Sequence, residues 1–218
     1  MTTLYVFIVI MASLCVWISA REPGPIVEDI VRWSPNDTKS INDYVSEIDV
    51  QQKTQTIELL KSHSSRRNLL VADKLDIALL GLGDTETVTK VFSKWWSSEE
   101  GWSWKGQLKL ITETKQPHLI PWLVHDLNRN ESSKPGQRGV EFFGPPKSVF
   151  AANAILKLIA DSPSLQPEVR EWARGVSTTL AYSDYEGRRA IVRQWWRANE
   201  KFFKEADYKA IQPLSVPK

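Results

Sequence analysis

The chain has 218 residues, of which 25% are charged and 42% are hydrophobic, a composition typical of a globular protein. Its formal net charge of +2 excludes the strong positive field expected of a nucleic-acid-binding domain. Its single cysteine, Cys15, excludes an internal disulfide and a thiolate metal site.

The first twenty residues predict a secretory signal. They carry no charged side chain, residues 4–18 are almost entirely apolar, and the small residue Ala20 precedes Arg21. This apolar stretch is shorter than the roughly 20 residues of a membrane-spanning helix. We therefore expect cleavage after Ala20 and a secreted or periplasmic protein. The alternative is an N-terminal membrane anchor formed by residues 4–18, which would be the chain's one membrane contact.

Residues 21–39 are rich in proline and predict a lead-in segment with room for one short helix. A single α-helical domain is expected to follow, from residue 40 to residue 218. Sequons begin at Asn36 and Asn130, and they would be used only in a host that glycosylates.

Apolar residues within the expected domain recur with the spacing i, i+3, i+4, i+7, which is typical of amphipathic helices. Separate windows match this template, at residues 41–48, 88–95, 120–127 and 169–176. Since no stretch alternates like a strand, the sequence predicts an all-α fold.

Two further segments, 68–82 and 148–160, are apolar over a wider arc and predict helices buried between neighbours. Gly83-Asp84 can end the first of these helices and cap the next one. Pro117 and Pro167 suit the first turn of a helix, where a missing N–H costs nothing. Pairs of an amphipathic outer helix and a buried inner helix build the core of helical repeats.

Three segments resemble HEAT repeats: 78–92 looks like the junction of two repeats, and 117–130 and 167–173 look like outer helices. The resemblance covers about residues 40–205 and implies a short right-handed α-solenoid of about four helix pairs. A loop insertion at 128–147 would interrupt it. The alternative fold is an irregular α-helical bundle.

The sequence contains no His-Glu-x-x-His, no Gly-x-Ser-x-Gly and no phosphate-binding loop. His118 and His125 lie two helical turns apart, roughly 10 Å, which is too far to hold one metal ion without other ligands. We therefore expect no catalytic residue, no metal and no cofactor, and we lean against an enzyme.

Basic stripes on the last two expected helices are the main candidates for partner binding. Arg189, Arg193 and Arg197 recur every fourth residue, and Arg170 and Arg174 form a shorter stripe on the preceding helix. Facing stripes would form a basic patch able to hold a carboxylate, a phosphate or an acidic partner. The alternative is a solvated face with local ion pairs.

Ten tryptophans are the unusual feature of the composition. Trp95, Trp96 and the later doublet at 195–196 extend helical apolar stripes, so we expect them in the core. Trp102 and Trp104 have no such stripe and are either exposed contact residues or rings packed over a helix junction. Phe142, in the loop insertion, is a further candidate contact.

A stacked-helix protein exposes an extended concave surface that suits a protein or peptide. We therefore expect a non-catalytic protein-binding or scaffolding module, which contacts another protein or a peptide, acidic ones included, through the arginine stripes and these aromatic residues. One alternative is a glycan-binding or glycan-cleaving envelope protein that uses Trp102 and Trp104, with Glu99 or Glu100 as the acid. The other is a purely structural envelope protein.

Overall fold

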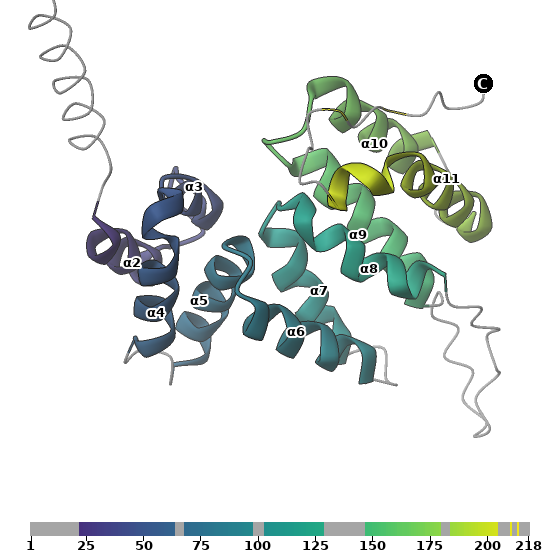
Figure 1. Cartoon of the computed structure of the whole chain (residues 1–218). Helices are drawn as coiled ribbons and strands as arrows, with labels where there is room; N and C mark the ends of the chain where they lie inside the picture. The colour runs from purple at the N-terminus through teal and green to yellow at the C-terminus, as the bar shows by residue number, and fades with distance from the viewer. Residues whose placement is uncertain are drawn as a thin grey trace, which may run out of the picture. The chain divides into compact units, whose positions relative to one another are not determined.

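The computed structural model describes residues 22–63, 68–97, 103–128, 147–179, 184–204, 210 and 213, without the side chains of residues 103–105. Over these residues the chain forms ten α-helices, joined in places by short 3₁₀ helices, and no strand. The all-α prediction is therefore confirmed. The chain divides into two compact units, residues 1–84 and residues 85–218 (Figure 1).

Unit 1 is a small helical cluster around an aliphatic core. It contains α2 (Pro23–Arg32), α3 (Ile41–Ser46), the 3₁₀ helix η1 (Val50–Gln52), α4 (Lys53–Ser62) and α5 (Leu69–Gly81). Helix α5 packs against α2, α3 and α4. The core consists of Ile26, Val27, Ile30, Ile41, Val45, Leu60, Leu75, Ala78, Leu79 and Leu82.

Helix α2 lies in the segment that the sequence predicts to be a lead-in outside the single domain at 40–218. In the structure Ile26, Val27 and Ile30 are buried in the core of unit 1. The apolar residues of α2 lie on one face of a helix, and burying that face against α4 and α5 stabilises the helix. The segment is thus part of a compact unit.

Local capping explains where the helices of unit 1 begin and end. Ser40 and Asp43 form a reciprocal capping box at the start of α3, in which the Asp43 carboxylate accepts a 2.6 Å hydrogen bond from the Ser40 N–H. Gly83, with φ of 70°, ends α5 as the sequence predicts. The Asp84 N–H then donates to the Leu79 carbonyl at 2.9 Å, the hydrogen bond of a Schellman motif.

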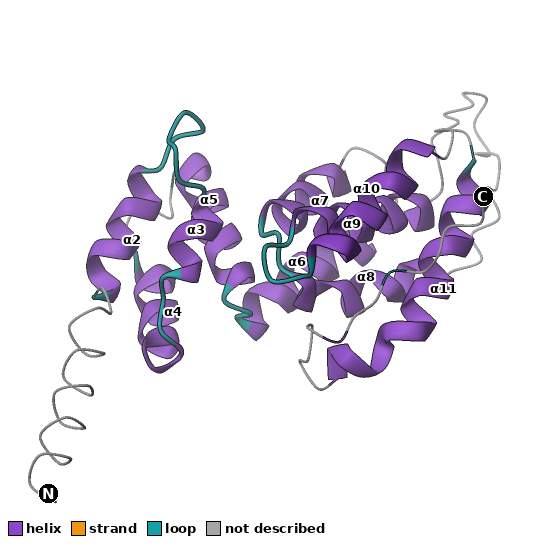
Figure 2. Ribbon diagram, turned by 90° about the horizontal axis from the view of Figure 1, so that it is seen from above, coloured by secondary structure: helices purple, strands orange, loops and turns teal. Residues whose placement is uncertain are grey.

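Unit 2 is built around one central helix, α9. The unit contains α6 (Thr85–Ser97), α7 (Ser103–Glu113), the 3₁₀ helix η3 (Pro117–Leu119), α8 (Ile120–Leu127), α9 (Lys147–Asp161), α10 (Pro167–Thr179) and α11 (Tyr185–Lys204). Helix α9 packs against α7, α8, α10 and α11 (Figures 1 and 2). Because ten of its fifteen residues are buried, α9 is the core helix of the unit.

The periodic windows at 88–95, 120–127 and 169–176 fall within α6, α8 and α10, and their apolar stripes are buried. Pro117 and Pro167 are the first residues of η3 and α10, as predicted. No helix among the described residues is long and apolar enough to cross a membrane. The signal segment and residues 129–146 of the loop insertion lie outside the described residues.

Candidate functional site

The arginine stripe predicted on α11 divides into buried and exposed members. Arg189 is 8% exposed, donates to the Ser148 hydroxyl at 2.7 Å and pairs with Glu186. Arg193 donates to the Leu127 carbonyl from Nε at 3.0 Å and from Nη2 at 2.6 Å. Arg197 is exposed. Two of the predicted contact residues thus hold helices together, and the third faces solvent.

Arg174, one of the two arginines predicted on α10, is held far from Arg189 of α11. Arg174 donates to the Ala160 carbonyl at 2.8 Å, near the carboxyl end of α9, whereas Arg189 contacts Ser148 near its amino end. Ser148 and Ala160 are twelve positions apart, which corresponds to about 18 Å along an α-helix. One small anion therefore cannot bind both guanidinium groups. Arg170, the remaining member of the set, is half-buried.

Three cations share one arrangement, in which a side chain from a later helix donates hydrogen bonds to carbonyl groups near the carboxyl end of an earlier helix. Lys147 donates to the Trp95 carbonyl and, at 3.3 Å, to the Trp96 carbonyl near the end of α6. Arg193 does the same for α8 and Arg174 for α9. The last carbonyls of a helix have no partner within it and carry partial negative charge, so a cation there is stabilising.

Of the first tryptophan doublet, Trp95 lies in the core as predicted, whereas Trp96 is half-buried. Trp95 is fully buried, and its indole N–H donates to the Asp126 carboxylate, which is also fully buried. Lys147 Nζ lies 4.9 Å from the centroid of the Trp95 ring. Half-buried Trp96 stacks on Trp122 with ring centroids 5.9 Å apart. Asp126 is not part of the predicted apolar stripe of α8, which consists of Ile120, Leu123, Val124 and Leu127, so the spacing does not predict its burial.

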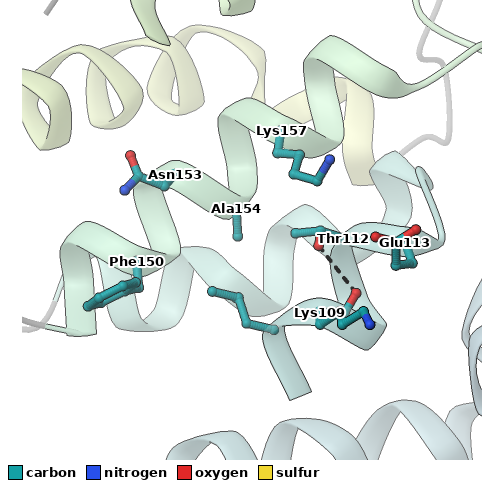
Figure 3. Close-up of a pocket in the computed structure, with 8 residues that line it drawn as sticks. Lys109, Thr112, Glu113, Phe150, Asn153, Ala154 and Lys157 are labelled. Carbon is teal, nitrogen blue, oxygen red and sulfur yellow. Dashed lines mark hydrogen bonds between the residues drawn. The ribbon is translucent and has the colours of Figure 1, made fainter. Parts of the chain in front are cut away.

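An open groove of about 400 Å³ lies between α7 and α9 (Figure 3). Phe150, Asn153, Ala154 and Lys157 contribute from α9, at the helical spacing i, i+3, i+4, i+7 that places them on one face. Helix α7 contributes Leu108, Lys109, Thr112 and Glu113. The groove is where the central helix of unit 2 is uncovered by its neighbours.

Polar groups surround the apolar part of this groove. Lys109 is exposed and has no ion-pair partner among the described residues, while Lys157 Nζ lies 2.8 Å from the Asp161 carboxylate. Asn153 accepts a 2.8 Å hydrogen bond at Oδ1 from Nη1 of Arg188, whose side chain is buried behind it. The surface of the groove is therefore mainly apolar, with polar side chains at its edges.

Sequence reasoning did not identify this groove. Its residues belong to two helices, and on each helix they read as an ordinary partly polar face. The one available signal was the mixed character of the expected helix at 148–160, in which Asn153 and Lys157 interrupt an apolar run.

Other predicted contacts stay predictions. Trp102, Phe142, Glu99 and Glu100 lie outside the described residues, as does the side chain of Trp104. Within the described part of the chain, no three His, Cys, Asp or Glu side chains form a group that could hold a metal ion.

Comparisons with protein-family models, with curated proteins and with solved structures found no match. A function for this chain is therefore proposed from the chemistry of its own site.

Proposed function

We propose that this protein is a non-catalytic binding module that holds a segment of another protein in the groove between α7 and α9. The observation that carries the proposal is the uncovered face of α9. A helix that buries ten of its fifteen residues still leaves Phe150 and Asn153 half-buried and Lys157 exposed in an open groove. Grooves between helices are common binding sites for peptide segments.

The packing of unit 2 supports a HEAT-like arrangement as part of this proposal. Helix α6 packs on α7, α8 packs on α9, and α7 packs on α9. If α6/α7 and α8/α9 are successive repeats, α7 and α9 are their inner helices. Inner helices line the concave face of a solenoid, which is the face that such proteins use for binding. The groove then lies on the expected binding surface of a secreted or periplasmic scaffold.

Selection of peptides followed by site-specific blocking tests the proposal. A random twelve-residue peptide library displayed on phage is selected on the purified protein, and the enriched peptides are measured by fluorescence anisotropy. Lys109→Cys, coupled to a bulky maleimide, obstructs the groove at an exposed position. Arg197→Cys, coupled to the same reagent, is the matched control on α11. Both variants share Cys15, so any reaction there is common to them.

We expect the enriched peptides to lose binding when the label is on residue 109 and to keep it when the label is on residue 197. A library that yields no binder, or binders that ignore the label on residue 109, would overturn the proposal. Loss of binding only with the label on residue 197 would contradict the groove as the binding site and favour the predicted arginine stripe on α11.

A further inference from the structure

We propose that the groove between α7 and α9 selects a protein segment by its large apolar side chains, which contact Leu108 and Phe150, and not by its charge. This inference rests on the proposed function and names the chemistry of the partner.

The charges around the groove balance one another. Lys157 Nζ lies 2.8 Å from the Asp161 carboxylate, so the charge of this lysine is already paired along α9. Lys109 and Glu113 both line the groove from α7, and their spacing of four residues places them on one face of that helix. A charged segment of either sign therefore meets no excess of opposite charge. An uncharged segment is the complementary partner for such a rim.

Polar groups beside the groove already have partners within the protein. The Asn153 amide oxygen accepts a 2.8 Å hydrogen bond from Arg188, which is 7% exposed. The Thr112 hydroxyl donates to the Lys109 carbonyl at 3.2 Å (Figure 3). A ligand hydrogen bond to either of these atoms would have to compete with an existing one. The polar rim therefore adds little to the selection of a partner.

Apolar side chains from both helices form the interior of the groove. Leu108 of α7 and Phe150 of α9 are half-buried, so each leaves part of its apolar surface uncovered. Ala154 lies one helical turn after Phe150 and is buried, and its single methyl group leaves open the space that a larger side chain would fill (Figure 3). A large apolar side chain placed over Ala154 would leave water and contact both helices.

Four synthetic twelve-residue peptides separate apolar contact from charge. Three alternate leucine with glutamine, glutamate or lysine, and the fourth replaces every leucine of the Leu/Gln peptide with alanine. Their dissociation constants are measured by fluorescence anisotropy at low and at high salt. We expect the three leucine peptides to bind within about threefold of one another at both salt concentrations, because the charges of the rim balance.

The Ala/Gln peptide should bind about tenfold more weakly than the Leu/Gln peptide, because alanine buries less apolar surface than leucine. Equal affinities for the Leu/Gln and Ala/Gln peptides would overturn the inference. A preference of about tenfold for the Leu/Glu or the Leu/Lys peptide would overturn it as well, because charge would then decide the selection.

Substitutions locate the apolar contact. Leu108→Gln should weaken Leu/Gln binding about three- to tenfold, because it replaces an apolar lining residue with a polar one. Phe150→Ala should do the same from the other helix, and the melting temperature of each variant reports whether it is folded. Leu70→Gln, at a leucine of α5 that is 75% exposed, is the matched control and should change nothing.

Lys109→Gln separates charge from apolar surface at the groove itself. It removes a charge from the rim and should leave Leu/Gln binding unchanged. An effect of Lys109→Gln or of Leu70→Gln as large as that of Leu108→Gln would contradict selection by the apolar interior.

The selected phage peptides distinguish the two proposals. Enriched peptides that the label on residue 109 blocks but that lack large apolar residues would overturn the apolar selection and leave the binding function standing. Enriched peptides that the label does not block would overturn both.

Discussion

The two units build their cores from different side chains. Among the described residues, the core of unit 1 is aliphatic and contains no buried aromatic ring. Unit 2 buries Phe92, Trp95, Trp172 and Trp195, together with the carboxylate of Asp126. Aliphatic side chains need only to leave water, whereas each buried indole also brings an N–H that needs an acceptor. The core of unit 2 therefore contains buried indole donors that the core of unit 1 lacks.

Only some of these buried indole N–H groups have a hydrogen-bond acceptor. Trp95 donates to Asp126, whereas the indole N–H groups of Trp172 and Trp195 have no hydrogen-bond partner among the described residues. Those two rings stack on each other, with centroids 5.8 Å apart and planes at 16°. Their contribution to stability must come from packing.

The largest expected effect is therefore the loss of a stacked ring in unit 2. Trp195→Ala removes a fully buried side chain that contacts Trp172 and Phe203. We expect it to lower the free energy of unfolding by about 3–5 kcal/mol, measured by guanidinium denaturation. Trp195→Phe should cost much less, because the N–H that it removes has no partner. Equal losses for the two variants would show that the N–H matters after all.

The matching change in unit 1 is Leu79→Ala. Leu79 is fully buried in an aliphatic cluster, so we expect a loss of about 2–5 kcal/mol from burial and cavity formation alone. Hydrogen exchange should quicken first in α5 and in α2, which packs on it. A loss below about 1 kcal/mol would mean that the aliphatic cluster closes around the cavity.

A smaller effect is expected when the buried carboxylate of Asp126, which accepts a hydrogen bond from the Trp95 indole, is removed. Asp126→Ala leaves the Trp95 N–H buried without this acceptor, and we expect a loss of about 1–3 kcal/mol. Asp126→Asn keeps an oxygen acceptor and should cost less. The Trp95 indole proton signal in NMR, identified with Trp95→Phe, reports the hydrogen bond. A signal that is unchanged in Asp126→Ala would contradict the contact.

The smallest effect tests what the units share. Lys74 donates to the carbonyl oxygens of Val31, at 3.2 Å, and of Trp33, where α2 ends, much as Lys147 does at the end of α6. We expect Lys74→Met and Lys147→Met each to lower the free energy of unfolding by about 0.3–1 kcal/mol. The melting temperature of each variant should fall slightly as a result. The exposed Arg197→Met is the control and should have no effect. A loss of stability for only one of the two lysine variants would show that the two contacts do not play the same role in the two units.

The candidate site could be predicted only in part from the sequence. The sequence shows that Lys109 and Lys157 are charged and that Phe150 is apolar. It does not show that the faces of α7 and α9 that carry them pack beside each other to form a groove. Conversely, the regular spacing of Arg189, Arg193 and Arg197 predicts a shared surface that the structure divides between a Ser148 contact, a helix end and solvent.

The sequence by itself determined the helices. Apolar spacing located α6, α8 and α10, and Gly83 ended α5, because residues at three- and four-residue spacing and a left-handed turn are local properties of the chain. Tertiary structure alone decided the role of the cations. The carbonyl that Arg193 reaches lies 66 residues earlier, and the one that Lys147 reaches at 3.3 Å lies 51 residues earlier. Whether a charged side chain binds a helix end or a partner depends on distances that only packing sets.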